Sequence, residues 1–197
     1  MRVSIFNYGV GNLYSLQAAL KREGVEPRLI TDVRGAGNAG ALLLPGVGSF
    51  REATRKLPMD EIRDLARAGK PLLGVCLGLQ LFFERSAEGP GRGLCLLPGS
   101  VKRLPSTVKV PQIGWNVLKI KYHTEFVAGV PNESWVYYVH SYYPATRGRW
   151  VVATSEYGLE YPSLIADKNI FGTQFHPEKS GSAGRAILRN FLRLIRR

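Results

Sequence analysis

Cysteine and histidine are both scarce in this sequence, which holds two cysteines and three histidines among 197 residues. So few cysteines cannot build a disulfide framework, and we expect a reduced, cytoplasmic setting. No two of these residues have the spacing of metal ligands, so we predict neither a metal centre nor another cofactor. Long apolar runs are missing as well. Residues 1–7 are interrupted too early by polar residues for a signal peptide, and no segment has the length of a membrane helix.

Negative charge is the other shortage. The chain has 15 acidic residues against 27 lysines and arginines, which gives a net charge of +12. Nucleic acids and phosphorylated metabolites both attract such a chain. However, the positive residues are scattered, no basic run exceeds Arg196-Arg197, and no nucleic-acid-binding motif accompanies them. We therefore expect an acidic protein partner or a generally basic surface rather than a nucleic acid.

The patterns that are present predict one α/β domain over residues 1–197. A chain of 197 residues can bury roughly 70% of its unfolded surface. In the first half, strands and helices alternate, with strands expected at 3–6, 28–31, 41–44 and 71–76 and helices at 12–23, 49–56, 59–68 and 77–86. In the second half we expect strands at 94–104, 112–120, 135–142, 150–155 and 164–175, then a helix at 180–197. The expected fold is a mostly parallel sheet flanked by helices, with antiparallel strands added late.

Residues 35–40 spell the G-x-G-x-x-G pattern of dinucleotide-binding proteins. That pattern requires a helix whose N-terminus receives the pyrophosphate, but here the apolar strand at 41–44 follows at once. We interpret residues 35–40 as a flexible loop.

The segment Gly74-Val75-Cys76-Leu77-Gly78 has the form of a nucleophile elbow, with cysteine in the place of serine. An apolar strand precedes it and an amphipathic helix follows. A turn this tight forces its central residue into a strained conformation, and the flanking glycines relieve the crowding. The helix N-terminus favours a thiolate, so we predict that Cys76 is a reactive nucleophile.

A cysteine nucleophile needs a base and donors for the oxyanion. His176 ends an apolar strand, and Glu178 lies two residues further, on the same face of an extended chain. The carboxylate would orient the imidazole, as in other catalytic triads. The amide of Leu77 and that of Val47, in the glycine-rich segment Pro45-Gly46-Val47-Gly48, are the candidate oxyanion donors.

The other cysteine and histidines have simpler interpretations. We interpret Cys95 as a small hydrophobic residue of a strand. His123 is expected on a surface turn. His140 either lines the site or is a satisfied buried histidine.

With these motifs in order, the chain resembles the class I glutamine amidotransferases. Within the family it is most similar to the glutaminase subunits of imidazole glycerol phosphate synthase, which serve histidine biosynthesis. The resemblance rests on the segments Asn7–Leu13, Pro45–Phe50, Gly74–Gln80, Gly114–Asn116, His140–Tyr142 and His176–Ser180. One departure is Gln112-Ile113, where relatives often carry His-Met, and it touches no expected catalytic position.

The resemblance implies a flavodoxin-like fold and a glutaminase mechanism. Cys76 would attack the side-chain amide of L-glutamine, with His176 and Glu178 completing the triad. The implied glutamine contacts are Gly46, Gly48, Gln80, Ser141 and Tyr142. The released ammonia would pass to a separate (β/α)8-barrel cyclase subunit, forming a heterodimer.

Asn12, Trp115 and Lys179 flank the site motifs and are the candidates for the docking face. The simpler alternatives are a core aromatic for Trp115 and a solvated charge for Lys179. We also expect weak glutaminase activity without the cyclase, since the oxyanion peptide at Gly46-Val47 can turn away until a partner binds. Two competing interpretations are the glutaminase subunit of pyridoxal phosphate or anthranilate synthesis, and a basic nucleic-acid-binding module.

Overall fold

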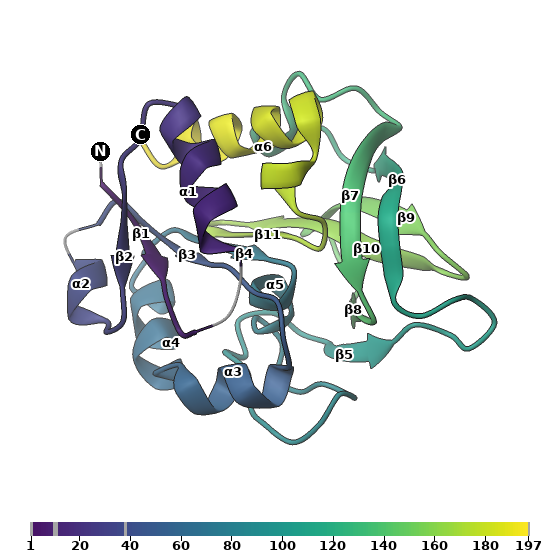
Figure 1. Cartoon of the computed structure of the whole chain (residues 1–197), viewed down its shortest axis with the longest axis horizontal. Coiled ribbons are helices and arrows are strands. Elements are labelled where there is room, and N and C mark those ends of the chain that lie inside the picture. Colours follow the sequence, from purple (N-terminus) through teal and green to yellow (C-terminus); the bar gives the residue numbers. More distant parts are fainter. Residues whose placement is uncertain (1, 10–11, 38, 197) are drawn as a thin grey trace.

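The chain folds around a mixed sheet, seen in a computed structural model that describes residues 2–9, 12–37 and 39–196 (Figure 1). Within these residues the sheet has nine strands in the order β2-β1-β3-β4-β11-β10-β9-β6-β7. The parallel half contains β1 (Val3–Phe6), β2 (Pro27–Ile30), β3 (Ala41–Leu44), β4 (Leu72–Val75) and β11 (Ile170–Thr173). The antiparallel half contains β10 (Glu160–Asp167), β9 (Val151–Glu156), β6 (Gln112–Ile120) and β7 (Ser134–His140). A separate antiparallel pair joins β5 (Ser100–Arg103) to β8 (Tyr142–Ala145).

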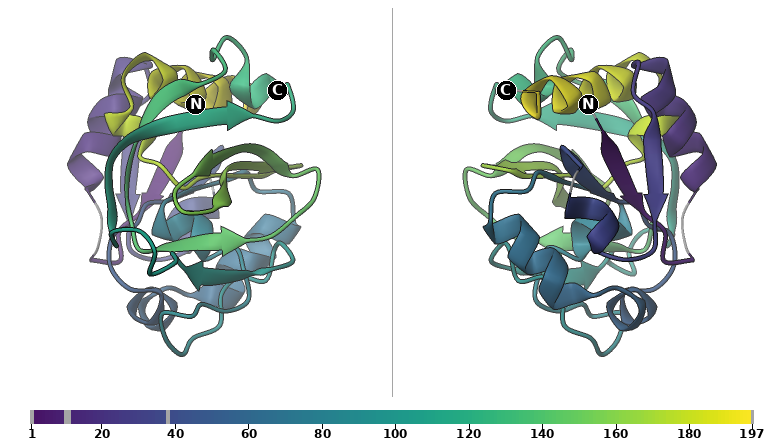
Figure 2. Two further views of the ribbon diagram at one scale, coloured as in Figure 1. Left: turned by 90° about the vertical axis from the view of Figure 1, so that its right-hand side faces the viewer. Right: turned by 90° about the vertical axis from the view of Figure 1, so that its left-hand side faces the viewer.

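Helices cover both faces of the sheet (Figures 1 and 2). One face carries α1 (Leu13–Arg22) and α6 (Gly181–Leu194), and the opposite face carries α3 (Phe50–Lys56), α4 (Met59–Arg67) and α5 (Leu77–Gln80). Successive residues of a strand point to opposite faces, so Leu43 packs in the core under α1 and α6 while Leu42 and Leu44 pack under the other helices. The described helical turns also include α2 (Arg34–Gly37) and the 3₁₀ turns η1 (Glu125–Val127) and η2 (Pro177–Lys179).

Glycines let α5 lie directly against the sheet. A Cβ atom on Gly78 would stand 1.7 Å from the carbonyl oxygen of Leu44 in β3. One on Gly74 would stand 2.5 Å from the carbonyl of Gly78, and one on Gly172 would stand 2.4 Å from Leu79. The contacts of Gly78 and Gly74 are with backbone atoms, which no real Cβ approaches that closely, so these two positions require glycine, whereas Gly172 faces the end of the Leu79 side chain. The short helix is therefore fixed at the carboxyl end of β4, immediately after Cys76.

The predicted mostly parallel sheet, flanked by helices and extended by antiparallel strands, is confirmed. The predicted strands at 3–6, 41–44 and 112–120 coincide with β1, β3 and β6. The helices at 12–23 and 49–56 begin with caps, since the side chains of Asn12 and Ser49 accept hydrogen bonds from the amides of Ser15 and Glu52. Residues 10 and 11 of the segment Asn7–Leu13, which precede this first helix, lie outside the described part of the chain.

The helix predicted at 77–86 is wrong in length, because α5 ends at Gln80. The carbonyl groups of residues 81, 82 and 84 accept hydrogen bonds from residues 93, 94, 96 and 97 instead of from a further helical turn. The same bonds hold residues 94–97 in a loop. Of the strand predicted at 94–104, only the part that forms β5 is therefore correct. Cys95 lies in that loop, half-buried and with φ of 51°, and not in a strand.

The single strand predicted at 164–175 is also wrong, since it contains parts of two antiparallel strands, β10 and β11. The chain reverses at Lys168, which has φ of 51°, and at Asn169, whose side chain donates to the carbonyls of Ala66 and Lys70. The loop predicted at 35–40 instead begins within the one-turn helix α2, and residue 38 lies outside the described part.

Candidate active site

Cys76 stands at the tip of the elbow between β4 and α5. Its backbone has φ of 55° and ψ of −106°, which confirms the predicted strained conformation. The amide of Cys76 donates to the carbonyl of Thr173 at 2.7 Å, which ties the elbow to the end of β11. The residue is 5% exposed, and its sulfur faces the carbonyl of Val139 at 3.7 Å.

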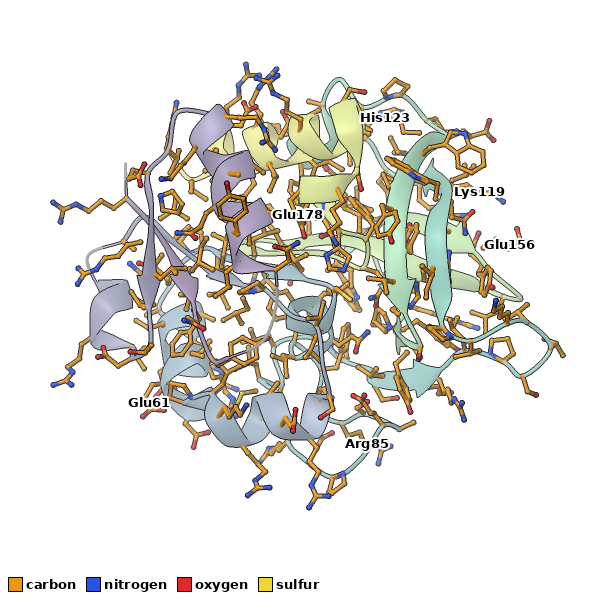
Figure 3. All side chains as sticks on the ribbon, viewed as in Figure 1. Glu61, Arg85, Lys119, His123, Glu156 and Glu178 are labelled. Atoms are coloured by element: carbon orange, nitrogen blue, oxygen red, sulfur yellow. The ribbon has the colours of Figure 1, made fainter. Side chains whose placement is uncertain are left out.

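His176 and Glu178 meet close to this elbow. Because β4 and β11 are parallel neighbours, the segments that follow them emerge at the same edge of the sheet. His176 Nδ1 lies 2.9 Å from Glu178 Oε1, and the two side chains are 4% and 3% exposed. The predicted pairing of these residues is present, but Glu178 lies in the 3₁₀ turn η2 and not on a strand. Figure 3 shows Glu178 near the middle of the molecule, between the α1–α6 layer and the sheet.

The electrostatics couple His176 to Cys76. Burial lowers the pKa of His176, but hydrogen bonding and charge interactions with Cys76 and Glu178 outweigh it and raise that pKa to about 10. Nδ1 is taken by Glu178, whereas Nε2 is buried and has no hydrogen-bond partner among the described residues, so Nε2 is the ring nitrogen left to interact with Cys76.

The two proposed oxyanion amides are not both free in this structure. The amide of Leu77 donates to the carbonyl of Gly46 at 3.4 Å, so this carbonyl occupies the direction from which an oxyanion would approach. Tyr8 holds the same segment, because its buried hydroxyl donates to the carbonyl of Pro45. Gly48, with φ of 114°, provides the flexible point on the other side of Val47, which is 40% exposed.

A cavity of about 220 Å³ opens beside the sulfur of Cys76. Four of the five glutamine contacts implied by the resemblance line it, namely Gly48, Gln80, Ser141 and Tyr142. Gly46 does not line it, because this residue is packed against Leu77 and Tyr8. The amide nitrogen of Gln80 is also engaged internally, since it donates to the carbonyl of Tyr142 at 2.8 Å.

The sequence did not indicate two polar residues of the site, one that lines the cavity and one that contacts the sulfur of Cys76. Glu88 brings a carboxylate to the lining, held there by a hydrogen bond from the amide of Phe50 at 2.6 Å. Gln174 is fully buried and donates from Nε2 to the sulfur of Cys76 at 3.5 Å. Glu88 stands in an irregular turn, and Gln174 reads as one more residue of an apolar strand, so neither carries a local signal.

Of the two interpretations left open for His140, the cavity position is observed. His140 is 6% exposed and lines the cavity, and its Nδ1 lies 2.8 Å from the carbonyl of Tyr142. Burial lowers its pKa to about 4, against the hydrogen bond with Tyr142, which raises it. His123 is exposed in the segment after β6, as predicted, and lies away from Glu178 (Figure 3).

The outer face of the β6–β7 ribbon is apolar and exposed. Trp115 is 53% exposed, so it is not the core aromatic that formed its simpler alternative. Its ring contacts Tyr137 at 6.0 Å between centroids, and the ammonium of Lys179 lies 5.6 Å from the centre of the Tyr137 ring. Asn12 is exposed at the start of α1. We name this surface the ribbon face, and it consists of Ile113, Trp115, Val117, Trp135, Tyr137 and Val139.

Together these groups can perform acyl transfer. A thiolate can attack a carbonyl carbon, and an imidazolium oriented by a carboxylate can protonate the leaving group. Among the described residues, no cluster of three His, Cys, Asp or Glu side chains has the geometry of a metal site. In the same part of the chain, no helix is long and apolar enough to cross a membrane.

Comparison with known proteins places these observations in a family. The model of the family "Glutamine amidotransferase class-I" matches residues 5–195. The imidazole glycerol phosphate synthase subunit HisH of Caldanaerobacter subterraneus is 44% identical, covering 98% of both chains. The protein of the same name from Archaeoglobus fulgidus is 44% identical over 99% of this chain and 100% of its own.

Solved structures agree on the fold. A putative GMP synthase component from Thermoplasma acidophilum superposes with a TM-score of 0.78 at 20% identity, covering 100% of this chain and 94% of its own. PurLQS from Thermotoga maritima gives 0.78 at 19% identity, covering 98% of both chains. The full-length family match and the close relatives show that this chain belongs to the class I glutamine amidotransferase family.

Proposed function

We propose that this protein is the glutaminase subunit of an imidazole glycerol phosphate synthase. It hydrolyses glutamine to glutamate and ammonia and delivers the ammonia to a cyclase subunit, which makes imidazole glycerol phosphate and aminoimidazole carboxamide ribotide. The observation that carries the proposal is the Cys76 elbow beside a buried His176–Glu178 pair, in a chain 44% identical along nearly its whole length to proteins named as this subunit.

The triad chemistry follows from the geometry. The thiolate of Cys76 attacks the side-chain amide carbon of glutamine and forms a tetrahedral intermediate. His176 gives its Nε2 proton to the departing nitrogen, so ammonia leaves and a glutamyl thioester remains. The neutral imidazole then takes a proton from water, the hydroxide attacks the thioester, and the thiolate leaves, which regenerates thiolate and imidazolium; the new carboxyl group of the product loses its proton to solvent as glutamate leaves. Glu178 keeps the imidazole oriented and stabilises its charge through both steps.

The oxyanion site forms in a second step. The donors are the amides of Leu77 and Val47, but in the resting arrangement the carbonyl of Gly46 takes the Leu77 amide. Rotation of the Gly46–Val47 peptide replaces that carbonyl with the Val47 amide and frees Leu77 at the same time. A partner that favours the rotated peptide therefore activates the glutaminase. If the free protein were as active as the complex, this switch would be contradicted.

The cavity provides contacts for the amino-acid end of glutamine. Glu88 is the acidic residue among the lining residues, and its carboxylate is the group that would pair with the positive ammonium group of glutamine. Gln80, Ser141 and Tyr142 line the same cavity and are the polar contacts for the remainder of the substrate. Gly48 leaves room on the side of the oxyanion segment.

The partner follows from the fate of ammonia. In water near neutral pH, ammonia is mostly protonated and no longer nucleophilic, so it must pass directly to its acceptor. The acceptor is a (β/α)8-barrel cyclase docked on the ribbon face, with Trp115, Lys179 and Asn12 as contacts. An exposed apolar surface of this kind is typical of a protein interface. Its strand β7 is bonded to the catalytic turn, because the carbonyl of Tyr137 accepts from the amide of His176 at 2.9 Å.

Co-purification tests the identity of the partner. The tagged chain is mixed with the cyclase, with the synthase component of pyridoxal phosphate synthesis and with that of anthranilate synthesis. We expect a stable pair with the cyclase alone, whereas stable pairing with another synthase overturns the assignment. A nucleic-acid-binding protein would instead show steep, salt-dependent binding to DNA or RNA that survives Cys76→Ala.

A further inference from the structure

A chain of side-chain amides connects the wall of the cavity to the nucleophile. Gln80 Nε2 donates to the carbonyl of Tyr142 at 2.8 Å and to Gln174 Oε1 at 3.1 Å. Gln174 Nε2 then donates to the sulfur of Cys76 at 3.5 Å. Both glutamines are buried, at 4% and 0% exposure, so water does not compete for these bonds.

The direction of this chain is fixed by its first member. The backbone carbonyl of Tyr142 can only accept, so the side-chain atom of Gln80 that faces it must be the NH₂ group. The second hydrogen of that group points to Gln174, which must therefore present its oxygen. Gln174 is left with its own NH₂ group toward Cys76, and its amide cannot flip without losing the bond to Gln80.

The sulfur thus lies between two groups that favour opposite protonation states. The carbonyl of Val139, 3.7 Å away, can only accept and therefore favours a thiol that donates its hydrogen. The NH₂ group of Gln174 donates and gains strength when the sulfur is negatively charged. We propose that Gln174 is a positioning residue that holds the Cys76 sulfur as a thiolate, and that Gln80 fixes the orientation of its amide.

Titratable groups also surround the sulfur and must be kept constant in a test. His176, paired with Glu178, and the buried Tyr8 both interact electrostatically with Cys76. His140 lines the same cavity. The amide of Gln174 does not titrate itself, so removing it alters the thiolate without adding or removing a charge.

The test measures the alkylation of Cys76 by iodoacetamide between pH 5 and 10, with mass spectrometry as the readout. The full chain carries Cys95→Ser to remove the other thiol, and neither glutamine nor cyclase is needed. In Gln174→Met, which keeps the size and loses the donor, we expect the midpoint to rise by about one pH unit, which lowers the rate about tenfold at pH values well below the wild-type midpoint. The matched control is Thr173→Val, an adjacent buried residue whose hydroxyl has no partner in the described structure and which should keep the wild-type midpoint.

Gln174→Leu supplies a second variant in case methionine disrupts the fold, which circular dichroism reports. Its side chain also lacks a donor and adds no titratable group, so the midpoint should rise as in Gln174→Met. A midpoint equal to that of Thr173→Val in the folded variants overturns the proposal.

The inference rests on the proposed function only for the role of Cys76 as nucleophile. If the midpoint moves but no chain hydrolyses glutamine, the proposed function fails and the inference stands. If glutamine is hydrolysed, Gln174→Met should lower kcat and leave KM unchanged, since Gln174 touches the sulfur and does not line the cavity. A raised KM with normal kcat contradicts it.

Discussion

His140→Asn removes a titratable imidazole from the interior while it keeps a hydrogen bond to the carbonyl of Tyr142. The Nδ2 group of asparagine takes the place of His140 Nδ1 and can still donate to the carbonyl of Tyr142. The histidine is 6% exposed, and burial lowers its pKa to about 4, with a smaller contribution in the same direction from the charge of His176. The wild-type protein therefore keeps this imidazole neutral where an unfolded chain would protonate it.

The magnitude follows from the two pKa values. A decrease from the ordinary value of 6.5 to about 4 corresponds to about 3 kcal/mol of unfolding free energy. Since the unfolded state binds more protons than the folded state between these values, stability is lost as the pH falls from 6.5 to 4. Above 6.5 neither state is protonated at this position, and below 4 both are, so the loss appears within that window.

Urea unfolding, followed by tryptophan fluorescence from pH 7.5 to 4, checks this expectation. Both proteins lose stability in acid through other groups, but the wild type should lose about 3 kcal/mol more than His140→Asn. His123→Asn replaces an exposed histidine and is the control that should follow the wild type. Parallel curves for the wild type and His140→Asn would refute the argument that burial keeps this imidazole neutral.

Three further expectations concern the triad, the elbow and the docking face. Glu178→Gln removes the negative charge that orients the imidazole of His176, so glutamine turnover should fall about 100-fold while KM is preserved. Unchanged turnover would contradict the role of Glu178 in the triad. Gly78→Ala places a Cβ 1.7 Å from a backbone oxygen of β3 and should lower the urea midpoint by an amount equivalent to about 4 kcal/mol, whereas Gly37→Ala, with open space around it, should not. Trp115→Ala should weaken cyclase binding roughly 10- to 100-fold in calorimetry, while Tyr122→Ala, an exposed aromatic outside the ribbon face, should leave the affinity unchanged.

The elements that the sequence predicts correctly are those whose boundaries are local. The strands at 3–6 and 41–44 are short apolar runs, and the helix at 50–56 begins at the hydroxyl of Ser49. The end of α5 is different, because it depends on hydrogen bonds with residues 93–97, which no local pattern records. The break between β10 and β11 likewise depends on Asn169 reaching the carbonyls of Ala66 and Lys70.

Residues of the candidate site likewise differ in whether a local sequence pattern indicates them. Cys76 is predictable because the glycines around an elbow are a local requirement, and the spacing of His176 and Glu178 indicates a pair. Glu88 reaches the cavity only because an irregular turn crosses the start of α3. The hydrogen bond from the Leu77 amide to the carbonyl of Gly46 depends on the contact between two loops, so the sequence indicates candidate oxyanion donors but not whether their amides are free.

Glutamate release by the purified protein, measured alone, with the barrel cyclase and with the cyclase plus its phosphorylated ligand, tests whether Cys76 hydrolyses glutamine for a cyclase on another chain. We expect slow release by the protein alone, a large increase in the complex, and no release from Cys76→Ala under any condition, although that variant still binds the cyclase. Equal release by the wild type and Cys76→Ala, or no release in the presence of the cyclase and its ligand, would contradict this role of Cys76.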